Sequence, residues 1–465
     1  MIDQATICAI STPPGMGAIA IIRLAGENAI DIADKAFRSP QSGKTLAGQK
    51  ANTLHFGHIA DGEETIDEVV VALFRAPHSF TGEDIVEISC HGSVYIQQRI
   101  LQLLVNKGAR MALPGEFTKR AFLNGKMDLS QAEAVADLIS STNAAAHKVA
   151  LKQMRGGFSD EISRLRGQLL HFIALIELEL DFSEEDVEFA DRTQLIELTT
   201  KIETLLKKLV GSFQLGNVIK NGVPVAIVGE TNVGKSTLLN ALLNEDRAIV
   251  SDIHGTTRDV IEDVVNIDGT AFRFFDTAGL RETADAIETM GIERSYSKLD
   301  QAEIVLLVTD LMNPLPLILE RIEKIRKRIG NQHLIIVGNK VDVTGTERIK
   351  ELEESVRLSE KEDIIFISAK NRQNLDTLIS LLKRKINMQD LDAGNVIVTN
   401  VRHYEALTHA HEAIVRVIEG LHSGISGDFL AQDIRECLHY LGEITGEITT
   451  DEILGHIFKN FCIGK

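Results

Sequence analysis

The sequence predicts an α/β and α protein: a mixed α/β domain at the N-terminus, a helical domain in two parts, and a second α/β domain inserted between those parts. Three observations support this fold class. Strand-like apolar runs alternate with helical patterns in the first 125 residues, helical spacing flanks the inserted segment on both sides, and strand patterns return within it. The 465 residues, 44% of them hydrophobic, are enough for separate cores.

The overall composition narrows the class of protein. A net charge of −18 argues against a broad basic surface for nucleic acid, so an RNA partner would need a local basic patch or a more basic second protein. Four cysteines (Cys8, Cys90, Cys437 and Cys462) lie far apart without a C-x-x-C pair and predict reduced thiols. No basic-then-apolar leader opens the sequence, and no apolar run approaches the length of a membrane span. We therefore expect a cytoplasmic protein with no membrane partner.

The first 125 residues indicate the mixed α/β domain. Its expected strands are 6–11, 18–24, 68–74 and 85–90, and its expected helices are 27–37 and 94–106. The G-x-G-x-x-A spacing at residues 15–20 is similar to a dinucleotide fingerprint, but a strand pattern follows it where that fingerprint needs a helix. Arg23, Glu87 and Lys126 are single charges that, on the residues alone, are typical of a solvated face.

Helical patterns flank the inserted segment. Ser130–Glu133 predicts a capping box that opens a helical pattern running to Leu151, and Thr449–Glu452 predicts a second capping box that opens the last helix. The other apolar stripes cover 165–180, 195–209, 407–418 and 429–438. Each stripe has one apolar face that needs a partner. The simplest arrangement is one helical domain that accepts an insertion, which chains tolerate where the inserted termini lie close together.

The inserted segment opens with a strand, a glycine-rich turn and a helix, the context in which G-x-x-x-x-G-K-[ST] binds phosphate. The motif covers Gly229–Ser236 and follows the apolar run Val225–Val228. We expect the first N–H groups of the helix and Lys235 to bind the phosphates, and the Ser236 hydroxyl to bind Mg²⁺. The nucleotide contacts expected from this loop are Asn232, Val233, Gly234, Lys235, Ser236 and Thr237.

Three further short motifs follow in order, each after a strand pattern. They are Asp276-Thr277-Ala278-Gly279, Asn339-Lys340-Val341-Asp342 and Ser368-Ala369-Lys370. The first is typical of a sensor of Mg²⁺ and γ-phosphate. The Asp342 carboxylate can accept hydrogen bonds from guanine N1–H and the 2-amino group, neither of which adenine offers. The motifs together predict GTP, and an ATP-dependent enzyme is the alternative if Asp342 does not contact the base.

The residues around the Asp276–Gly279 motif bear on hydrolysis. Gly255–Asp259 is the candidate switch I, with Thr257 able to complete Mg²⁺ coordination. Leu280 stands where many GTPases carry a Gln that orients the attacking water. Because leucine cannot hydrogen-bond to water, hydrolysis needs another polar group. The candidates nearby are Arg281, Glu282, Asp285 and Glu288. An arginine finger within the chain is not evident, and a cation bound by the Asn232 amide could fill that place.

Longer motifs resemble those of the MnmE (TrmE) family of tRNA-modification GTPases over essentially the whole chain. They are T-P-P-G at 12–15, P-H-S-F-T-G-E-D at 77–84, P-G-E-F-T-K-R-A-F-L-N-G-K at 114–126, D-T-A-G-L-R-E at 276–282 and C-I-G-K at 462–465. The resemblance implies a folate-binding and dimerisation domain at 1–125, helical parts at 126–216 and 387–465, and a Ras-like P-loop GTPase domain at 217–386.

The resemblance also implies ligands. Arg23, Glu87, Lys126 and Lys465 would contact a tetrahydrofolate one-carbon derivative, 5-formyl or 5,10-methylene. The family's GTPase domains associate across the nucleotide with K⁺ in place of an arginine finger, and its water-orienting carboxylate matches Glu288. The implied K⁺ ligands are Asn232, Ser251, Ile253 and Thr256. The implied nucleotide contacts of the same loop are Ser251, Asp252, Ile253, His254, Gly255, Thr256 and Thr257.

The partners implied by the resemblance are a second copy of the chain, tRNA and MnmG, an FAD protein. With MnmG the family installs an aminomethyl or carboxymethylaminomethyl group at carbon 5 of the wobble uridine. Cys462 is, by its position, either a catalytic residue or a structural thiol. Thr231 departs from the Pro that many relatives carry in the P-loop. The alternative function is a ribosome-assembly or regulatory GTPase switch, which would not bind a reduced folate.

Overall fold

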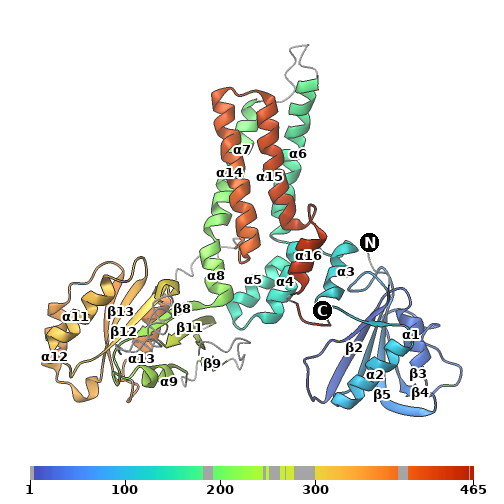
Figure 1. Cartoon of the computed structure of the whole chain (residues 1–465), viewed down its shortest axis with the longest axis horizontal. Helices are drawn as coiled ribbons and strands as arrows, with labels where there is room; N and C mark the ends of the chain where they lie inside the picture. Colours follow the sequence, from blue (N-terminus) through green and yellow to red (C-terminus); the bar gives the residue numbers. More distant parts are fainter. Residues whose placement is uncertain are drawn as a thin grey trace, which may run out of the picture. The chain divides into compact units, whose positions relative to one another are not determined.

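The computed structural model describes residues 5–181, 192–243, 248–250, 262–267, 269–276, 299–385, 396–459 and 461–464. The chain forms two compact units, drawn in Figure 1. Unit 1 comprises 1–136, 152–199 and 412–465, and unit 2 comprises 137–151 and 200–411. The domain boundaries expected at residues 125, 216 and 386 stay predictions. No helix in the described part of the chain is long and apolar enough to cross a membrane.

Unit 1 contains a seven-stranded sheet in the order β3-β4-β5-β6-β2-β1-β7. Its strands are β1 (Ile7–Ile10), β2 (Ile19–Ala25), β3 (Phe37–Arg38), β4 (Thr53–Asp61), β5 (Glu64–Phe74), β6 (Ile85–His91) and β7 (Arg110–Met111). Neighbouring strands are antiparallel except β1 and β7. Helices α1 (Ala29–Ala36) and α2 (Val94–Asn106) cover one face, where alternate strand residues such as Ile22, Val71 and Ile88 join them in one core (Figure 1). The strands and helices expected in this region are confirmed.

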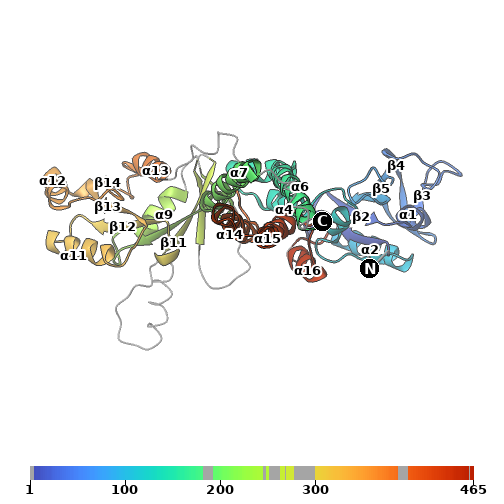
Figure 2. The same ribbon diagram turned by 90° about the horizontal axis from the view of Figure 1, so that it is seen from above.

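The helices that follow the sheet of unit 1 include a long pair from distant parts of the sequence. Besides α1 and α2, the described helices that lie wholly in this unit are α3 (Glu116–Leu123), α6 (Ser159–Asp181), α15 (Gly427–Thr445) and α16 (Asp451–Lys459). Helices α6 and α15 lie side by side in both views (Figures 1 and 2). Arg166 of α6 donates from Nε to the Leu438 carbonyl at 3.3 Å, and Arg435 pairs with Glu177. Four helices run from one unit into the other: α4 (Leu129–Ser140), α5 (Ala144–Met154), α7 (Arg192–Gly211) and α14 (Val401–Ser423).

The helix starts differ from the predicted capping boxes. Helix α4 is capped by Asp128, whose Oδ1 accepts the Gln131 N–H at 2.9 Å while Gln131 Oε1 accepts the Asp128 N–H at 2.9 Å. The box is therefore Asp128–Gln131, and the prediction of Ser130–Glu133 is wrong. At α16 the Thr450 hydroxyl accepts the Ile453 N–H at 3.3 Å, so the prediction of Thr449–Glu452 is also wrong. In both places two adjacent or nearly adjacent polar residues can accept an N–H group at the helix start, and side-chain geometry selects one.

The helical pattern expected to run from Ser130 to Leu151 is broken. Helix α4 ends at Ser140 and α5 begins at Ala144. Asn143 caps α5, because its Oδ1 accepts the Ala146 N–H at 2.8 Å. Two helices therefore share the predicted pattern, and its apolar residues are buried only in part, since Ile139 is 48% exposed.

Unit 2 contains a second seven-stranded sheet, in the order β14-β13-β12-β8-β11-β10-β9. Its strands are β8 (Val223–Val228), β9 (Ala248–Val250), β10 (Glu262–Ile267), β11 (Thr270–Asp276), β12 (Ile304–Asp310), β13 (His333–Asn339) and β14 (Glu362–Ile367). The five strands from β14 to β11 are parallel, whereas β10 is antiparallel to both of its neighbours. Such a parallel core is typical of an α/β domain, the class that the sequence predicts for the inserted segment.

The helices of unit 2 cover both faces of its sheet. They are α8 (Phe213–Asn221), α9 (Lys235–Leu243), α11 (Leu315–Arg326), α12 (Thr346–Ser355) and α13 (Leu375–Arg384). Helices α9 and α13 share one core with the sheet, and α11 and α12 share another. Figure 2 shows α11 and α13 on opposite sides of the strands.

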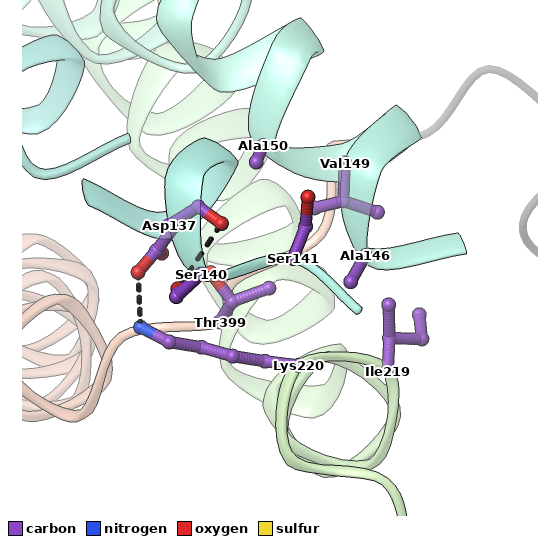
Figure 3. Close-up of a pocket in the computed structure, with 9 residues that line it drawn as sticks. All are labelled: Asp137, Ser140, Ser141, Ala146, Val149, Ala150, Ile219, Lys220 and Thr399. Atoms are coloured by element: carbon purple, nitrogen blue, oxygen red, sulfur yellow. Dashed lines mark hydrogen bonds and ion pairs between the residues drawn. The ribbon is translucent and has the colours of Figure 1, made fainter. Parts of the chain in front are cut away.

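A small cavity lies where the turn between α4 and α5 meets α8, all within unit 2 (Figure 3). Its volume of about 20 Å³ suits a single water molecule and excludes a nucleotide. Lys220 lines the cavity and pairs with Asp137 at 2.7 Å. The same turn reaches the β10–β11 hairpin, where Asn266 Nδ2 donates to the Thr142 carbonyl at 3.2 Å. The cavity therefore lies in the region where the α4–α5 turn packs against α8 and the β10–β11 hairpin.

Candidate nucleotide site

The loop 229–234 turns sharply between β8 and α9. Lys235, at the first position of α9, is only 9% exposed and donates from Nζ to the carbonyls of Gly229 at 2.8 Å and Glu230 at 2.6 Å. These two acceptors hold the ammonium group at the centre of the loop. The loop thus presents a fixed positive charge beside a helix N-terminus, which together favour an anion.

Two glycines of the loop cannot carry a side chain. Gly229 has φ +149°, and an added Cβ would lie 2.3 Å from the Val308 carbonyl oxygen. Gly234 has φ +99°, and an added Cβ would lie 2.3 Å from Asn339 Nδ2. The glycines are therefore required both for the backbone turn and for close packing against the neighbouring strands.

Asn339 connects three of the predicted motifs. Its buried side chain donates from Nδ2 to the Val233 carbonyl at 2.8 Å and accepts from the Ala369 N–H at Oδ1 at 3.0 Å. The loop 229–234, the N-K-V-D motif and the S-A-K motif therefore meet at one edge of the sheet. The reason is the fold, because the carboxyl ends of β8, β13 and β14 lie at the same edge of parallel strands.

The rest of the N-K-V-D and S-A-K motifs is ordered by one side-chain ion pair and by backbone contacts. Lys340 adopts φ +73° and pairs through Nζ with Asp310 Oδ2 at 2.6 Å, at the end of β12. Asp342 is exposed in the short 3₁₀ turn Val341–Val343, so its carboxylate is accessible. Ser368 is buried and exchanges backbone hydrogen bonds with Gln373, while Lys370 is exposed. Asn232, Ser236 and Thr237 are exposed on the P-loop side of this edge.

Part of the predicted site lies outside the described residues. The side chain of Asp276, at the end of β11, belongs to this part, although its backbone is described. The others are Ser251, Asp252, Ile253, His254, Gly255, Thr256, Thr257, Thr277, Ala278, Gly279, Leu280, Arg281, Glu282, Asp285, Glu288 and Lys465. Their roles stay predictions.

Arg23 and Glu87 form a second charged group, in unit 1. They lie directly opposite each other on β2 and β6, and the Arg23 guanidinium donates to Glu87 Oε1 from Nε at 2.9 Å and from Nη2 at 2.7 Å. The Arg23 guanidinium also lies 5.6 Å from the ring centres of both Phe80 and Phe117. The structure thus brings together two of the predicted folate contacts, which the residues alone assigned to a solvated face.

The segment that carries Phe80 is connected to the other predicted contacts. Lys126 is exposed, and its Nζ donates to the Pro77 carbonyl at 2.9 Å. The exposed Cys462 accepts the Gly115 N–H at its carbonyl at 3.3 Å. The Ser11 hydroxyl donates to the Gly464 carbonyl at 3.1 Å. The C-terminal segment therefore packs against the loops at the edge of the unit 1 sheet.

The four cysteines differ in their environment. Burial raises the pKa of Cys8 to about 11 and that of Cys437 to about 12, and burial and the charge of Asp67 raise the pKa of Cys90 to about 11. These three thiols stay protonated at neutral pH and are poor nucleophiles. Cys462 alone of the four is exposed.

A buried network near Phe117 was missed by the sequence reasoning. Glu116 accepts from Arg110 at 2.6 Å and from Arg120 at 3.2 Å, and Arg120 also reaches Glu83 at 3.1 Å. Burial alone would raise the pKa of Glu116, but the hydrogen bonds from Arg110 and from the Leu113 N–H outweigh it and hold that pKa below its ordinary value. The i,i+4 spacing of Glu116 and Arg120 was the available signal.

Two family models match the chain. The model of the MnmE helical domain matches residues 129–462, and the model of the GTP-binding protein TrmE N-terminus matches residues 6–126. This chain belongs to the MnmE family of tRNA modification GTPases. The MnmE relative from Parabacteroides distasonis is 59% identical over 464 residues, covering 99% of this chain and 100% of the relative. The MnmE relative from Flavobacterium psychrophilum is 54% identical over 469 residues and covers all of both chains.

Solved structures add little to the MnmE assignment. Aquifex aeolicus Era bound to GDP·AlF₄⁻ is 29% identical, covers 41% of this chain and 65% of its own, and gives a TM-score of 0.28. Membership of the MnmE family follows from the full-length relatives and the two family models.

Proposed function

We propose that this chain hydrolyses GTP at the loop 229–236 and acts with an FAD-dependent partner, MnmG, in modifying carbon 5 of the tRNA wobble uridine. The observation that carries the GTPase part is the pair of hydrogen bonds made by Asn339 to Val233 and Ala369. Through those two bonds a single side chain connects the proposed phosphate-binding loop to the motifs proposed to bind the base. The tRNA part rests on membership of a family whose relatives are named tRNA modification GTPases.

The roles of the described residues follow from their chemistry. Lys235 and the N–H groups at the start of α9 bind the phosphates. The accessible Asp342 carboxylate accepts two hydrogen bonds from guanine, and Asn339 holds the base-binding and phosphate-binding loops in register. Discrimination against ATP then comes from an acceptor that adenine would leave unpaired.

The proposal includes two cations. Ser236 and Asn232 are exposed at the loop, and hydroxyl and amide oxygens are ligands that suit hard cations. Ser236 and Thr257 would hold Mg²⁺, and Asn232, Ser251, Ile253 and Thr256 would hold K⁺. When bound, these ions offset the negative charge that develops on the transferred phosphoryl group. Glu288 would orient the attacking water, because Leu280 cannot.

The charged group of unit 1 supports the folate part of the proposal. A pterin ring offers N–H donors that the Glu87 carboxylate can accept, and the carboxylates of a folate tail suit the exposed Lys126 ammonium. Arg23 would hold Glu87 in place, and Lys465 would complete the site. We propose that this site binds 5-formyl- or 5,10-methylene-tetrahydrofolate as the one-carbon donor. We also propose that the protein is a homodimer and acts in the cytoplasm.

GTP turnover in KCl and in NaCl at equal ionic strength, with Glu288→Ala measured alongside, tests the hydrolytic proposal. We expect strong stimulation by K⁺, and near-complete loss of turnover with retained nucleotide binding in Glu288→Ala. Equal rates in both salts would remove K⁺ from the proposal, and full activity of Glu288→Ala would remove the carboxylate.

Reduced-folate binding, measured by calorimetry with 5-formyl-tetrahydrofolate, tests the modification part. Binding that Lys126→Met weakens would support it. Absence of binding, with GTP turnover intact, would favour a ribosome-assembly or regulatory GTPase switch.

A further inference from the structure

The first residue after Gly229 in the phosphate-binding loop is tied to a neighbouring helix. Glu230 forms an ion pair with Arg321 of α11. The phosphate-binding motif leaves position 230 open, so this pair is not part of the signature that predicts nucleotide binding. It is a contact particular to the residues that this chain carries there.

Helix α11 gives Arg321 a fixed position. Ile318 and Ile322, on either side of Arg321 in the sequence, are buried in the core that α11 shares with the sheet. The Arg321 side chain is only 15% exposed, whereas that of Glu230 is 50% exposed. Arg321 is therefore the anchored partner, and Glu230 is the one that is held.

The burial of Arg321 makes the pair necessary. Its Nη1 is buried and has no hydrogen-bond partner among the described residues. A guanidinium group withdrawn from water needs a counter-charge, and the Glu230 carboxylate supplies it. Loss of either partner leaves an uncompensated charge or an untethered loop.

Glu230 is also the residue that aims the phosphate-binding lysine. Its carbonyl accepts from Lys235 Nζ at 2.6 Å, and the Gly229 carbonyl accepts from the same ammonium group at 2.8 Å. One residue therefore receives Arg321 at its side chain and Lys235 at its backbone. A shift of Glu230 moves one of the two acceptors that fix the Lys235 ammonium group.

We propose that Arg321 is a positioning residue for nucleotide binding: it holds Glu230 from α11 so that Lys235 points at the phosphates. Arg321 acts through Glu230 and need not contact the nucleotide. The inference rests on the proposed phosphate site at this loop. Because GTP and GDP share the α- and β-phosphates, loss of the Glu230–Arg321 ion pair weakens the binding of both nucleotides. The loss raises KM for GTP more than it lowers kcat.

The test compares nucleotide affinity and GTP turnover in four variants. Arg321→Gln and Glu230→Gln should each raise the Kd for GDP by about tenfold, the size expected for one lost charge-assisted contact. The double variant Glu230→Arg/Arg321→Glu restores opposite charges and should recover most of the affinity. Arg326→Gln is the matched control, because Arg326 lies on the same helix and pairs with Glu362 at 2.8 Å, away from the loop. It should lower the melting temperature and leave the Kd unchanged.

The inference is overturned if Arg321→Gln weakens GDP binding no more than Arg326→Gln does, or if the reversed pair recovers nothing while folding normally by circular dichroism. Lys235→Ala separates this failure from that of the proposed site. If Lys235→Ala abolishes GDP binding and the Arg321 variants do not weaken it, the loop binds phosphate and only the positioning role is wrong. If Lys235→Ala still binds GDP, the proposed site itself is wrong.

Discussion

The two seven-stranded sheets gather their charged residues in different ways. In unit 2, parallel strands end at one edge, so loops that are far apart in the sequence meet there through Asn339. In unit 1, antiparallel strands put Arg23 and Glu87 opposite each other on the face of the sheet. A parallel sheet brings loops together, whereas an antiparallel pair brings side chains together. The first arrangement suits a ligand held by backbone groups, and the second suits one held by side chains.

Among the tests of this comparison between the two sheets, Lys235→Ala has the largest expected effect. We expect this change to raise the Kd for GTP by at least about 100-fold, because an ammonium group held by two carbonyls and aimed at phosphate is lost. Titration with a fluorescent GTP analogue measures it. Arg23→Met in the other sheet should change this Kd by less than about twofold. A large effect of Arg23→Met on GTP binding would contradict the separation of the two kinds of site.

Asp342→Asn tests whether the edge of the parallel sheet reads the base. We expect the Kd for GTP to rise by about 100-fold, because the amide nitrogen of Asn meets donors of guanine where a carboxylate accepted from them. Xanthosine triphosphate, which carries a carbonyl in place of the 2-amino group, should bind the variant better than GTP does. If Asp342→Asn still prefers GTP to xanthosine triphosphate, the base does not contact residue 342.

Glu87→Gln tests the face of the antiparallel sheet. We expect a loss of about 1 kcal/mol in the free energy of unfolding of unit 1, because the partly buried Arg23 guanidinium loses its charged acceptor. Urea unfolding followed by circular dichroism measures the loss. Lys126→Met is the control, since that exposed ammonium bonds only a carbonyl among the contacts described for it. A destabilisation equal to that of the control would show that the pair adds nothing to stability.

The smallest expected effect concerns acid, and it is shared by both units. Burial would raise the pKa of Glu362, but hydrogen bonds from Arg326 and from the Ser359 N–H hold it below its ordinary value of 4.5, as Arg110 does for Glu116. A carboxyl whose pKa is lowered by folding stabilises the native state above its unfolded pKa, and this contribution is lost as pH falls through the folded value. Glu116→Gln and Glu362→Gln should therefore destabilise at pH 7 and do so progressively less below pH 4.5. Thermal melts from pH 7 to pH 3 measure this, and a constant difference would contradict it.

The sequence predicted the parallel sheet better than the contacts across it. The strand and helix around Gly229–Ser236, and the strands before Asn339 and Ser368, were all expected, because each motif sits directly after an apolar run. The bridging amide of Asn339 was not expected. Its two partners lie far away in the chain, and only the register of parallel strands brings them to one side chain.

Predictions from the residues alone failed for two reasons: neighbouring residues offered equal choices, and paired residues far apart in the sequence left no local signal. Asp128 and Ser130 can both cap a helix, and the pattern does not say which one does. Arg23 and Glu87 looked like isolated surface charges, because antiparallel pairing across distant strands leaves no local signal. The ion pair between Glu230 and Arg321 was also not predicted, because the sequence around either residue gives no sign of the other.

The pairing of α6 with α15 has a consequence for how the chain is made. The ion pair between Glu177 and Arg435 spans 258 residues of sequence, and the whole of β8–β14 is synthesised between its two members. At a synthesis rate of about 5–20 residues per second, α6 waits roughly 13–50 s for α15 to emerge. During that wait α6, whose Leu165, Leu169 and Ile173 are buried in the folded protein, lacks its neighbour α15. We expect early folding of the intervening sheet to shorten the loop that α6 and α15 must close.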